Sequence, residues 1–342
     1  MAIILDADEL SGKTYLGYLQ EHLFRALAEL IPQEKFLVPN TTPGIGLPSN
    51  MQGAVFPPKK GLFFRKKTEK WLRESNATAF VSFKRILMAP APLKQVLIIA
   101  TEAQLNESSI ILSTSAIGVT SKYLEAAFEK KHPGLAQKCF LAEGIIAAQQ
   151  LPQDFDSQVI KDAFAEGKEY FICADFNLDK ERLVTLLKGF SAFKKRLQSN
   201  WKLVIALRSA ESVKREEAEA LLANYKYRAD VVLTDAERLS EKIAGAYALV
   251  SMDNREIFPI PVAEAAKVKT PVIAQVTYTL KGLFDDAVIY PADGSSGAIG
   301  DRLMKIYKEE ATRLQLKRKL EDFQSRLNAN EAAKALVKVL FP

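Results

Sequence analysis

Residues 170–206 read YFICADFNLDKERLVTLLKGFSAFKKRLQSNWKLVIA, and this stretch decides the fold class. Apolar runs at Tyr170–Cys173 and Lys202–Ala206 have the composition of buried strands, and Lys180–Leu197 between them has the spacing of an amphipathic helix. A strand, a crossover helix and a second strand form a parallel pair. The stretch therefore predicts an α/β protein built on parallel sheets.

The same alternation of short apolar runs and amphipathic stretches continues in both directions. A polar, proline-bearing segment at 149–156, QQLPQDFD, divides it into two sets of similar size. We therefore expect two doubly wound, Rossmann-like domains facing one cleft, with boundaries at 1–155 and 156–320, and a terminal helix at 321–342 that returns to the first domain. The other strands are expected at 3–5, 36–38, 79–83, 96–100, 110–112, 117–120, 138–141, 231–233, 248–251, 271–274 and 288–290.

Composition excludes several classes of protein. With 342 residues, 48% of them hydrophobic and 26% charged, the chain can fill two cores, which excludes disorder as its main state. Cys139 and Cys173 are too few for a disulfide framework or a thiolate zinc site, and His22 and His132 are too few for a histidine-rich metal cluster. We therefore expect no bound metal and a reducing, cytoplasmic compartment.

The first residues, MAIILDADEL, lack the basic region of a secretory signal, and no stretch approaches the roughly 18 uninterrupted apolar residues of a membrane span. We expect a protein that is neither secreted by that route nor integral to a membrane. The net charge is +6, from 47 basic and 41 acidic residues, which is too small over 342 residues to predict a nucleic-acid partner.

Charge is concentrated in one segment, from Pro57 to Arg73, which reads PPKKGLFFRKKTEKWLR. Seven basic residues stand there against the single Glu69, and three aromatic rings are interleaved with them. Basic and large apolar side chains together suit peripheral contact with an anionic membrane, here the inner membrane surface. The alternative is a solvated helix whose Phe64 and Trp71 pack inward.

A loop from Ala7 to Thr14, ADELSGKT, lies between the first strand and the first helix. Gly12, Lys13 and Thr14 fit the end of a phosphate-binding loop, with alanine in place of its first glycine, which would suit a nucleotide hydrolase. Two acidic residues, Asp8 and Glu9, would oppose a bound polyphosphate there. The alternative is a tight turn in which Gly12 lets the backbone approach a ligand or a neighbouring loop.

A second candidate region, residues 251–266, reads SMDNREIFPIPVAEAA. Glu256 and Glu264 flank a predicted helix start, and Pro261 suits the first turn of that helix. The helix N-terminus can receive a diphosphate, Glu264 can accept hydrogen bonds from a ribose diol, and Glu256 can reach the hydroxyls of an attached sugar. The alternative is a pair of solvated glutamates on a surface helix.

With residues 173–180, CADFNLDK, this region resembles the C-terminal domain of family 4 retaining glycosyltransferases, which have the GT-B fold. In that family a strand ends in Gly-Arg, a lysine follows five residues later, and a Glu-x7-Glu motif precedes Gly-x-Pro-Val-Ile. The resemblance covers about residues 165–320 and is fainter in the first half, at Ser11-Gly12 and at 117–121. Matching positions are Lys180, Glu256, Phe258, Pro261, Glu264, Ala265 and Pro271-Val272-Ile273.

The resemblance implies a hexosyltransferase-type enzyme that moves a sugar from a nucleoside-diphosphate sugar to an unknown carbohydrate, lipid or small-molecule acceptor. It implies retention of stereochemistry and no metal or cofactor, with an acceptor-side first domain and a donor-binding second domain. Lys180 is then expected to neutralise the leaving diphosphate, and Glu256 to orient the donor sugar. The other donor-binding candidates are Glu264, Phe258, Ile260, Pro261, Gly12 and Arg208.

Several departures from the family pattern weaken that donor site. Asp175 stands where the phosphate-binding arginine is expected, which is a two-charge change beside a diphosphate. Arg208 or Arg255 is a candidate to restore the positive charge, and the alternative for both is a surface arginine. A non-catalytic relative that kept the scaffold and lost the donor site is therefore the competing prediction. Glycines of the family are replaced by Ala174, Ile257, Pro259 and Lys269.

Overall fold

The computed structural model describes residues 2–7, 10, 13–39, 46–56, 63–87, 93–147 and 151–342. The chain forms two compact units. The first comprises Met1–Ala147, Glu256–Phe258 and Asn328–Pro342, and the second comprises Ala148–Arg255 and Pro259–Leu327. The first long segment thus ends at Ala147, beside the predicted divider at 149–156, whose residues 149 and 150 lie outside the described part.

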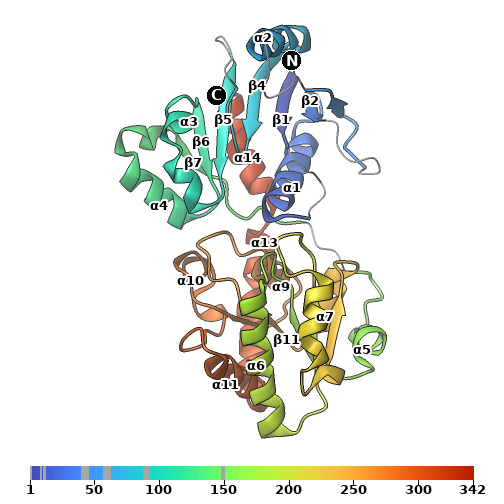
Figure 1. Cartoon of the computed structure of the whole chain (residues 1–342). Helices are drawn as coiled ribbons and strands as arrows, with labels where there is room; N and C mark the ends of the chain where they lie inside the picture. The colour runs from blue at the N-terminus through green and yellow to red at the C-terminus, as the bar shows by residue number, and fades with distance from the viewer. Residues whose placement is uncertain are drawn as a thin grey trace. The chain divides into compact units, whose positions relative to one another are not determined.

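The first unit contains a seven-stranded parallel sheet in the order β3-β2-β1-β4-β5-β6-β7 (Figure 1). The strands alternate with helices, as the sequence pattern predicts. Its strands are β1 (Ala2–Asp6), β2 (Lys35–Pro39), β3 (Met51–Ala54), β4 (Ala77–Ser82), β5 (Lys94–Ile99), β6 (Ala116–Val119) and β7 (Cys139–Leu141). Its helices are α1 (Tyr15–Leu30), α2 (Phe64–Ser75), η1 (Glu102–Asn106), α3 (Ser108–Leu112), α4 (Lys122–Lys131), η2 (Pro133–Lys138) and α14 (Ala329–Leu340).

The predicted strand at 110–112 is wrong, because those residues lie in helix α3. Ile111 is buried in the core, whereas Leu112 is 62% exposed. A run of three apolar residues cannot distinguish a strand from a short helix. The flanking geometry decides here, since the N–H groups of Ile110 and Ile111 already donate to the carbonyl of Glu107 and so begin a helical turn.

The second unit contains a five-stranded parallel sheet in the order β10-β9-β8-β11-β12. Figure 1 shows α6 and α7 in front of it. The segment 288–290, predicted as a strand, forms only an isolated bridge at Ile289. The strands are β8 (Tyr170–Cys173), β9 (Lys202–Ala206), β10 (Val231–Thr234), β11 (Ala248–Ser251) and β12 (Val272–Ala274). The helices are α5 (Ser157–Ala165), α6 (Lys180–Leu197), α7 (Arg215–Ala223), η3 (Arg228–Asp230), α8 (Leu239–Gly245), α9 (Ile260–Lys267), α10 (Tyr278–Phe284), η4 (Asp285–Ala287), α11 (Ser296–Lys308), α12 (Glu310–Glu321) and α13 (Phe323–Arg326).

Close packing of α6 on α11 helps to fix the core of the second unit. Gly300 permits it, since a Cβ there would lie 3.0 Å from the carbonyl oxygen of Gly189. Phe171, Phe193 and Trp201 pack nearby in edge-on and tilted contacts, with ring centroids 5.2–5.9 Å apart. Large aromatic rings in tilted contact make such a core dense and rigid.

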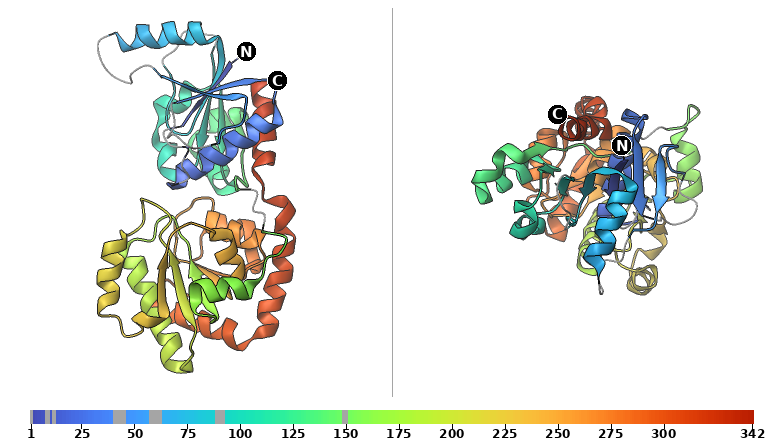
Figure 2. Two further views of the ribbon diagram at one scale, coloured as in Figure 1. Left: turned by 90° about the vertical axis from the view of Figure 1, so that its right-hand side faces the viewer. Right: turned by 90° about the horizontal axis from the view of Figure 1, so that it is seen from above.

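The C-terminal helices are divided between the two units. Helices α12 and α13 stay with the second unit, where Lys269 Nζ contacts the Glu321 carboxylate at 2.9 Å and Gln324 Nε2 donates to the carbonyl of Lys267. Helix α14 belongs to the first unit, and Lys94 Nζ donates to the carbonyl of Val339 at 2.9 Å (Figure 2). The chain enters the first unit at Asn328, which is seven residues beyond the predicted start of the terminal helix at 321.

Candidate functional site

The C-terminal ends of the parallel strands in the second unit all lie at one edge of the sheet, here called the carboxyl edge. Ligands of open α/β sheets bind at such edges, where loops and helix N-termini converge. Asp175 follows β8, Arg208 follows β9, and the loop containing Asp253 follows β11. Helices α6 and α9 both begin at this edge, so the second-unit residues predicted from the sequence lie around it.

Asp175 joins the ends of two strands. Its side chain is 1% exposed, and its two oxygens accept hydrogen bonds from Ser251 Oγ at 2.7 Å and from the backbone N–H of Met252 at 2.5 Å. Burial, together with the nearby charge of Asp253, raises the pKa of this carboxyl group from 3.8 to about 6, although the two hydrogen bonds act to lower it. The acid that stands in place of the expected arginine thus bonds the end of β11 and the loop that follows it.

Arg208 and Glu264 form a buried, bidentate ion pair. The guanidinium nitrogens lie 2.5 and 3.0 Å from the two carboxylate oxygens, and the side chains are 6% and 4% exposed. The guanidinium also lies over the ring of Phe176, 4.0 Å from its centroid. Glu264 is therefore not a solvated glutamate and Arg208 is not a surface arginine, so those two alternatives from the sequence are wrong.

Lys180 and Arg255 make weaker, more exposed contacts at the same edge. Lys180, in the first turn of α6, is 64% exposed and lies 3.7 Å from the Glu217 carboxylate. Arg255 is 32% exposed and pairs with Asp253 in its own loop at 2.7 Å. Such contacts contribute little to stability because water screens them. Lys180 is thus able to reorient toward a bound anion.

The first two residues of α9 carry apolar side chains. The side chains of Ile260 and Pro261 are buried, and Pro261 has no N–H to donate. Glu256 and Phe258 are counted with the first unit, where the N–H of Phe258 donates to Tyr15 Oη at 3.0 Å. The site described here therefore consists of second-unit residues, and the roles predicted for Glu256 and Phe258 stay predictions.

Sequence reasoning missed Arg182. Its guanidinium donates to Asn254 Oδ1 at 2.7 Å, to the carbonyl of Asn177 at 3.0 Å and to Asp179 Oδ2 at 3.1 Å. It thereby links the loop after β8 to the loop after β11. The available signal was its position three residues after Asp179, which caps α6 and accepts from the backbone N–H of Arg182.

Charges at this edge are therefore already matched. Among the described residues, Arg182, Arg208 and Arg255 each contact a carboxylate. A diphosphate that binds here has to displace one of these partners or rely on Lys180 and backbone N–H groups. The lysine that replaces a family glycine, Lys269, adopts a left-handed φ of 57° after α9, and its side chain reaches Glu321.

The loop predicted at Gly12, Lys13 and Thr14 of the first unit lies partly outside the described residues. Gly12 lies in the part that is not described, and Thr14 accepts a hydrogen bond from Gly17 N as the cap of α1. In the described part of the chain, no group of three or more His, Cys, Asp and Glu side chains is arranged to hold a metal. No helix of that part is long and apolar enough to cross a membrane.

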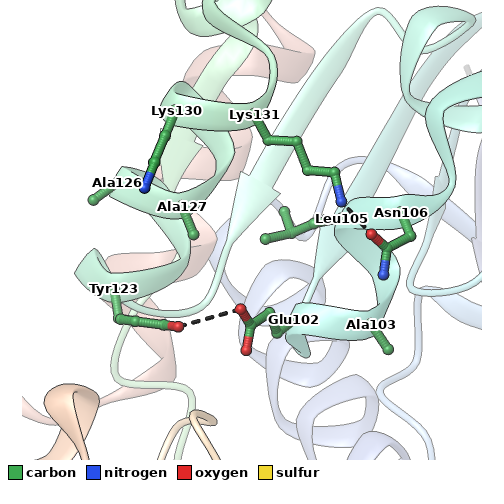
Figure 3. A pocket seen from close by; sticks show the side chains of 9 residues that line it. All are labelled: Glu102, Ala103, Leu105, Asn106, Tyr123, Ala126, Ala127, Lys130 and Lys131. Atoms are coloured by element: carbon green, nitrogen blue, oxygen red, sulfur yellow. Dashed lines mark hydrogen bonds between the residues drawn. The ribbon is translucent and has the colours of Figure 1, made fainter.

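A groove of about 810 Å³ opens on the first unit between η1 and α4 (Figure 3). Tyr123 Oη donates to the Glu102 carboxylate at 3.3 Å at one end, and Lys131 Nζ donates to Asn106 Oδ1 at the other. The Tyr123 end lies where β5 and β6 terminate, at the carboxyl edge of the first sheet. The other residues that line the groove are Ala103, Leu105, Ala126, Ala127 and Lys130.

Comparisons with known proteins agree with this architecture. Residues 154–322 match the family described as "Glycosyl transferases group 1". WaaG, a glycosyltransferase involved in lipopolysaccharide biosynthesis, is 14% identical with a TM-score of 0.73 over 100% of both chains. The sucrose-phosphate synthase of Thermosynechococcus elongatus is 14% identical, with a TM-score of 0.74 over 99% of this chain and 98% of that one.

A third solved structure, Anabaena Alr3699/HepE in complex with UDP and glucose, is 9% identical with a TM-score of 0.72 over 99% of this chain and 98% of that one. A sequence comparison with curated proteins gave no match. The low identities to these neighbours establish the fold, and the family model establishes the kinship of the second unit. Residues 154–322 therefore belong to the group 1 glycosyl transferase family, as a divergent member, and the chain as a whole has the GT-B fold.

Proposed function

We propose that this chain moves a hexosyl group from a nucleoside-diphosphate sugar to an acceptor, with retention of stereochemistry and without a metal. Membership of the group 1 glycosyl transferases supports sugar transfer as the reaction. The observation that carries the proposal is the buried pair of Arg208 and Glu264 at the carboxyl edge. A guanidinium and a carboxylate are the two groups that a diphosphate and a ribose diol need.

In this proposal the negative charge that develops on the leaving diphosphate is met by fixed cations and dipoles. Lys180 and the N-terminus of α9 stabilise that charge, which takes the place of a metal ion. Glu264 accepts hydrogen bonds from the ribose hydroxyls, and Glu256 orients the donor sugar. The acceptor binds on the first unit, and the groove between η1 and α4 supports this because it opens at the carboxyl edge of that sheet.

Titration calorimetry with UDP-, GDP- and ADP-sugars tests the proposal most directly. One similar structure holds UDP-glucose, so UDP-sugars are the first donors to try. We expect one nucleotide series to bind with a dissociation constant below 1 mM, and the matching sugar donor to be hydrolysed or transferred slowly. If no nucleoside diphosphate and no sugar nucleotide binds at millimolar concentration, the enzyme proposal is overturned.

A non-catalytic GT-B scaffold is the second candidate. The matched charges at the carboxyl edge favour it, because Arg182, Arg208 and Arg255 are each already in contact with a carboxylate. This candidate predicts no binding in the same titration, so one experiment separates the two. The third interpretation, a nucleotide hydrolase at Gly12, Lys13 and Thr14, is not proposed, since the family match concerns glycosyl transferases and Thr14 caps α1.

We also propose that helix α2 contacts anionic membrane surfaces. Lys66, Lys67, Lys70 and Arg73 are exposed on its outer face, and Phe63 before its first turn is 62% exposed. Phe64 and Trp71 are only partly exposed, and Trp71 packs on Phe56 with centroids 4.7 Å apart. The contact is thus electrostatic, with Phe63 as the one described ring available to enter the interface. Lys59 and Lys60 lie outside the described residues.

A further inference from the structure

We propose that Arg208 makes the site select nucleoside diphosphates over nucleosides, by exchanging its Glu264 partner for the diphosphate. The inference rests on the proposed donor site and adds a specificity-determining residue to it. In this proposal the ion pair holds the site in order while no donor is bound. When a donor binds, the contact between Arg208 and Glu264 is replaced by two new ones. The ribose hydroxyls donate to Glu264, and the diphosphate accepts from Arg208.

The position of the pair points to this role. Arg208 lies in the loop that follows β9, and Glu264 lies in α9, which begins after β11, so both belong to the carboxyl edge. Their side chains are 6% and 4% exposed, and the guanidinium rests on the Phe176 ring. A guanidinium that stacks on an aromatic ring keeps that contact while its N–H groups change partners.

Burial turns the pair into a selective element. A charged group that loses its partner inside a protein pays its full desolvation penalty. A nucleoside offers its ribose diol to Glu264 but brings no anion to replace that carboxylate beside Arg208. A nucleoside diphosphate carries both the diol and the anion on neighbouring parts of one molecule, so each member of the pair receives a new partner.

The other two described arginines at this edge are less suited to the exchange. Arg182 is held by a carbonyl and an amide oxygen as well as by Asp179. Arg255 is 32% exposed and pairs with Asp253 within the same loop. Arg208, in contrast, pairs across 56 residues of sequence with the residue proposed to hold the ribose. Release of Glu264 is therefore coupled directly to release of Arg208.

Calorimetric titration of uridine and UDP, and of the guanosine and adenosine pairs, into the full chain tests the proposal. For the nucleotide series that binds, we expect Arg208→Gln to weaken binding of the nucleoside diphosphate at least tenfold. Binding of the nucleoside should be unchanged or tighter. Glu264→Gln should weaken binding of both the nucleoside and the nucleoside diphosphate. Arg208→Lys should fall between wild type and Arg208→Gln, because it keeps the charge but loses the bidentate geometry.

Arg238→Gln is the matched control. Arg238 also makes a bidentate contact with a glutamate, Glu241, at 2.9 and 2.7 Å, and it also lies over a ring, that of Phe164. It is 42% exposed and is not part of the proposed site. We expect this variant to bind both ligands as the wild type does.

Each outcome decides between the proposals. If the wild type binds a nucleoside diphosphate and Arg208→Gln keeps the same ratio of diphosphate to nucleoside affinity, Arg208 only packs, and the inference falls while the proposed function stands. If the wild type binds no nucleoside diphosphate at millimolar concentration, both fall. Should thermal unfolding show that Arg208→Gln is not folded, the ratio measured for Arg208→Lys decides, and an unchanged ratio overturns the inference.

Discussion

Two buried carboxylates at the carboxyl edge of the second unit are stabilised in different ways. Asp175 is held by the hydroxyl of Ser251 and the N–H of Met252, which are neutral donors belonging to a neighbouring strand and its loop. Glu264 is held by the guanidinium of Arg208. The first arrangement ties the loop to the strand, and burial, only partly offset by these hydrogen bonds, raises the pKa of the acid to about 6. The second arrangement places a buried carboxylate against a buried guanidinium, which is the pair proposed to exchange partners when a donor binds.

The difference shows how the charges at the proposed donor site depart from the family pattern. A cation expected beside the diphosphate has become a structural acid in Asp175, while a cation elsewhere on the same edge, Arg208, covers the glutamate proposed to bind ribose. Neutral donors satisfy a carboxylate through fixed geometry, whereas a guanidinium satisfies it through charge. Substitution of either acid should therefore have distinct consequences.

The largest expected effect is on the charged pair. Glu264→Ala should lower the free energy of unfolding by about 3–5 kcal/mol, because it removes the carboxylate that pairs with the buried guanidinium of Arg208. Urea unfolding followed by circular dichroism measures the loss. Glu241→Ala, which breaks the more exposed pair with Arg238, should cost no more than about 1 kcal/mol. Equal losses in the two variants would contradict the contrast between buried and exposed pairs.

The neutral arrangement is tested by Asp175→Asn. The raised pKa means that the acid stabilises the fold fully below pH 3.8, the unfolded value, and that this contribution is lost as the pH rises through about 6. Two pH units correspond to about 3 kcal/mol. An asparagine keeps both contacts, since its amide accepts from Met252 N and donates to Ser251 Oγ.

Stability curves of wild type and Asp175→Asn from pH 3.5 to 8 provide the measurement. We expect the free energy of unfolding of the variant, relative to that of the wild type, to increase by about 3 kcal/mol from pH 3.5 to pH 8. Groups that titrate equally in both proteins cancel in the difference. Parallel curves would mean that Asp175 titrates near its ordinary pKa, and the account of its burial would have to be withdrawn.

Exposed cations at the same edge should have smaller effects. Lys180→Ala should weaken binding of both the nucleoside diphosphate and the sugar donor about tenfold, since the two ligands share the diphosphate. Glu256→Ala should spare the nucleoside diphosphate and weaken the intact sugar donor. Lys188→Ala is the control, because Lys188 is exposed on the same helix, α6, away from its first turn. Identical affinities for Lys180→Ala and Lys188→Ala would remove Lys180 from the site.

The smallest effect is expected where the charges are fully solvated. Lys67→Gln on α2 should reduce binding to vesicles containing anionic lipid about fivefold at low salt, or about 1 kcal/mol, and less at physiological salt. Co-sedimentation measures this, and Lys130→Gln on α4 serves as a matched change on the first unit. Binding that is insensitive to Lys67 and to salt would contradict the membrane proposal.

The sequence by itself determined the architecture and the family. Alternation of apolar and amphipathic segments predicts two sets of parallel strands, and two short motifs, one that ends at Lys180 and one that runs from Glu256 to Glu264, predict the glycosyltransferase kinship that the family match confirms. Both signals are local, since periodicity and spacing are properties of neighbouring residues in the chain. Short runs carry too little of this information, and for that reason 110–112 was predicted as a strand.

Only the tertiary structure decided which charges meet. Arg208 and Glu264 are 56 residues apart, and Asp175 reaches Ser251 and Met252 across 76 and 77 residues, so no spacing rule connects them. The same holds for the inward packing of Trp71 on Phe56. Burial and the choice of hydrogen-bonding partner both depend on how strands and helices pack together. They determine whether a carboxylate at the sheet edge is held by neutral donors or by a charged partner.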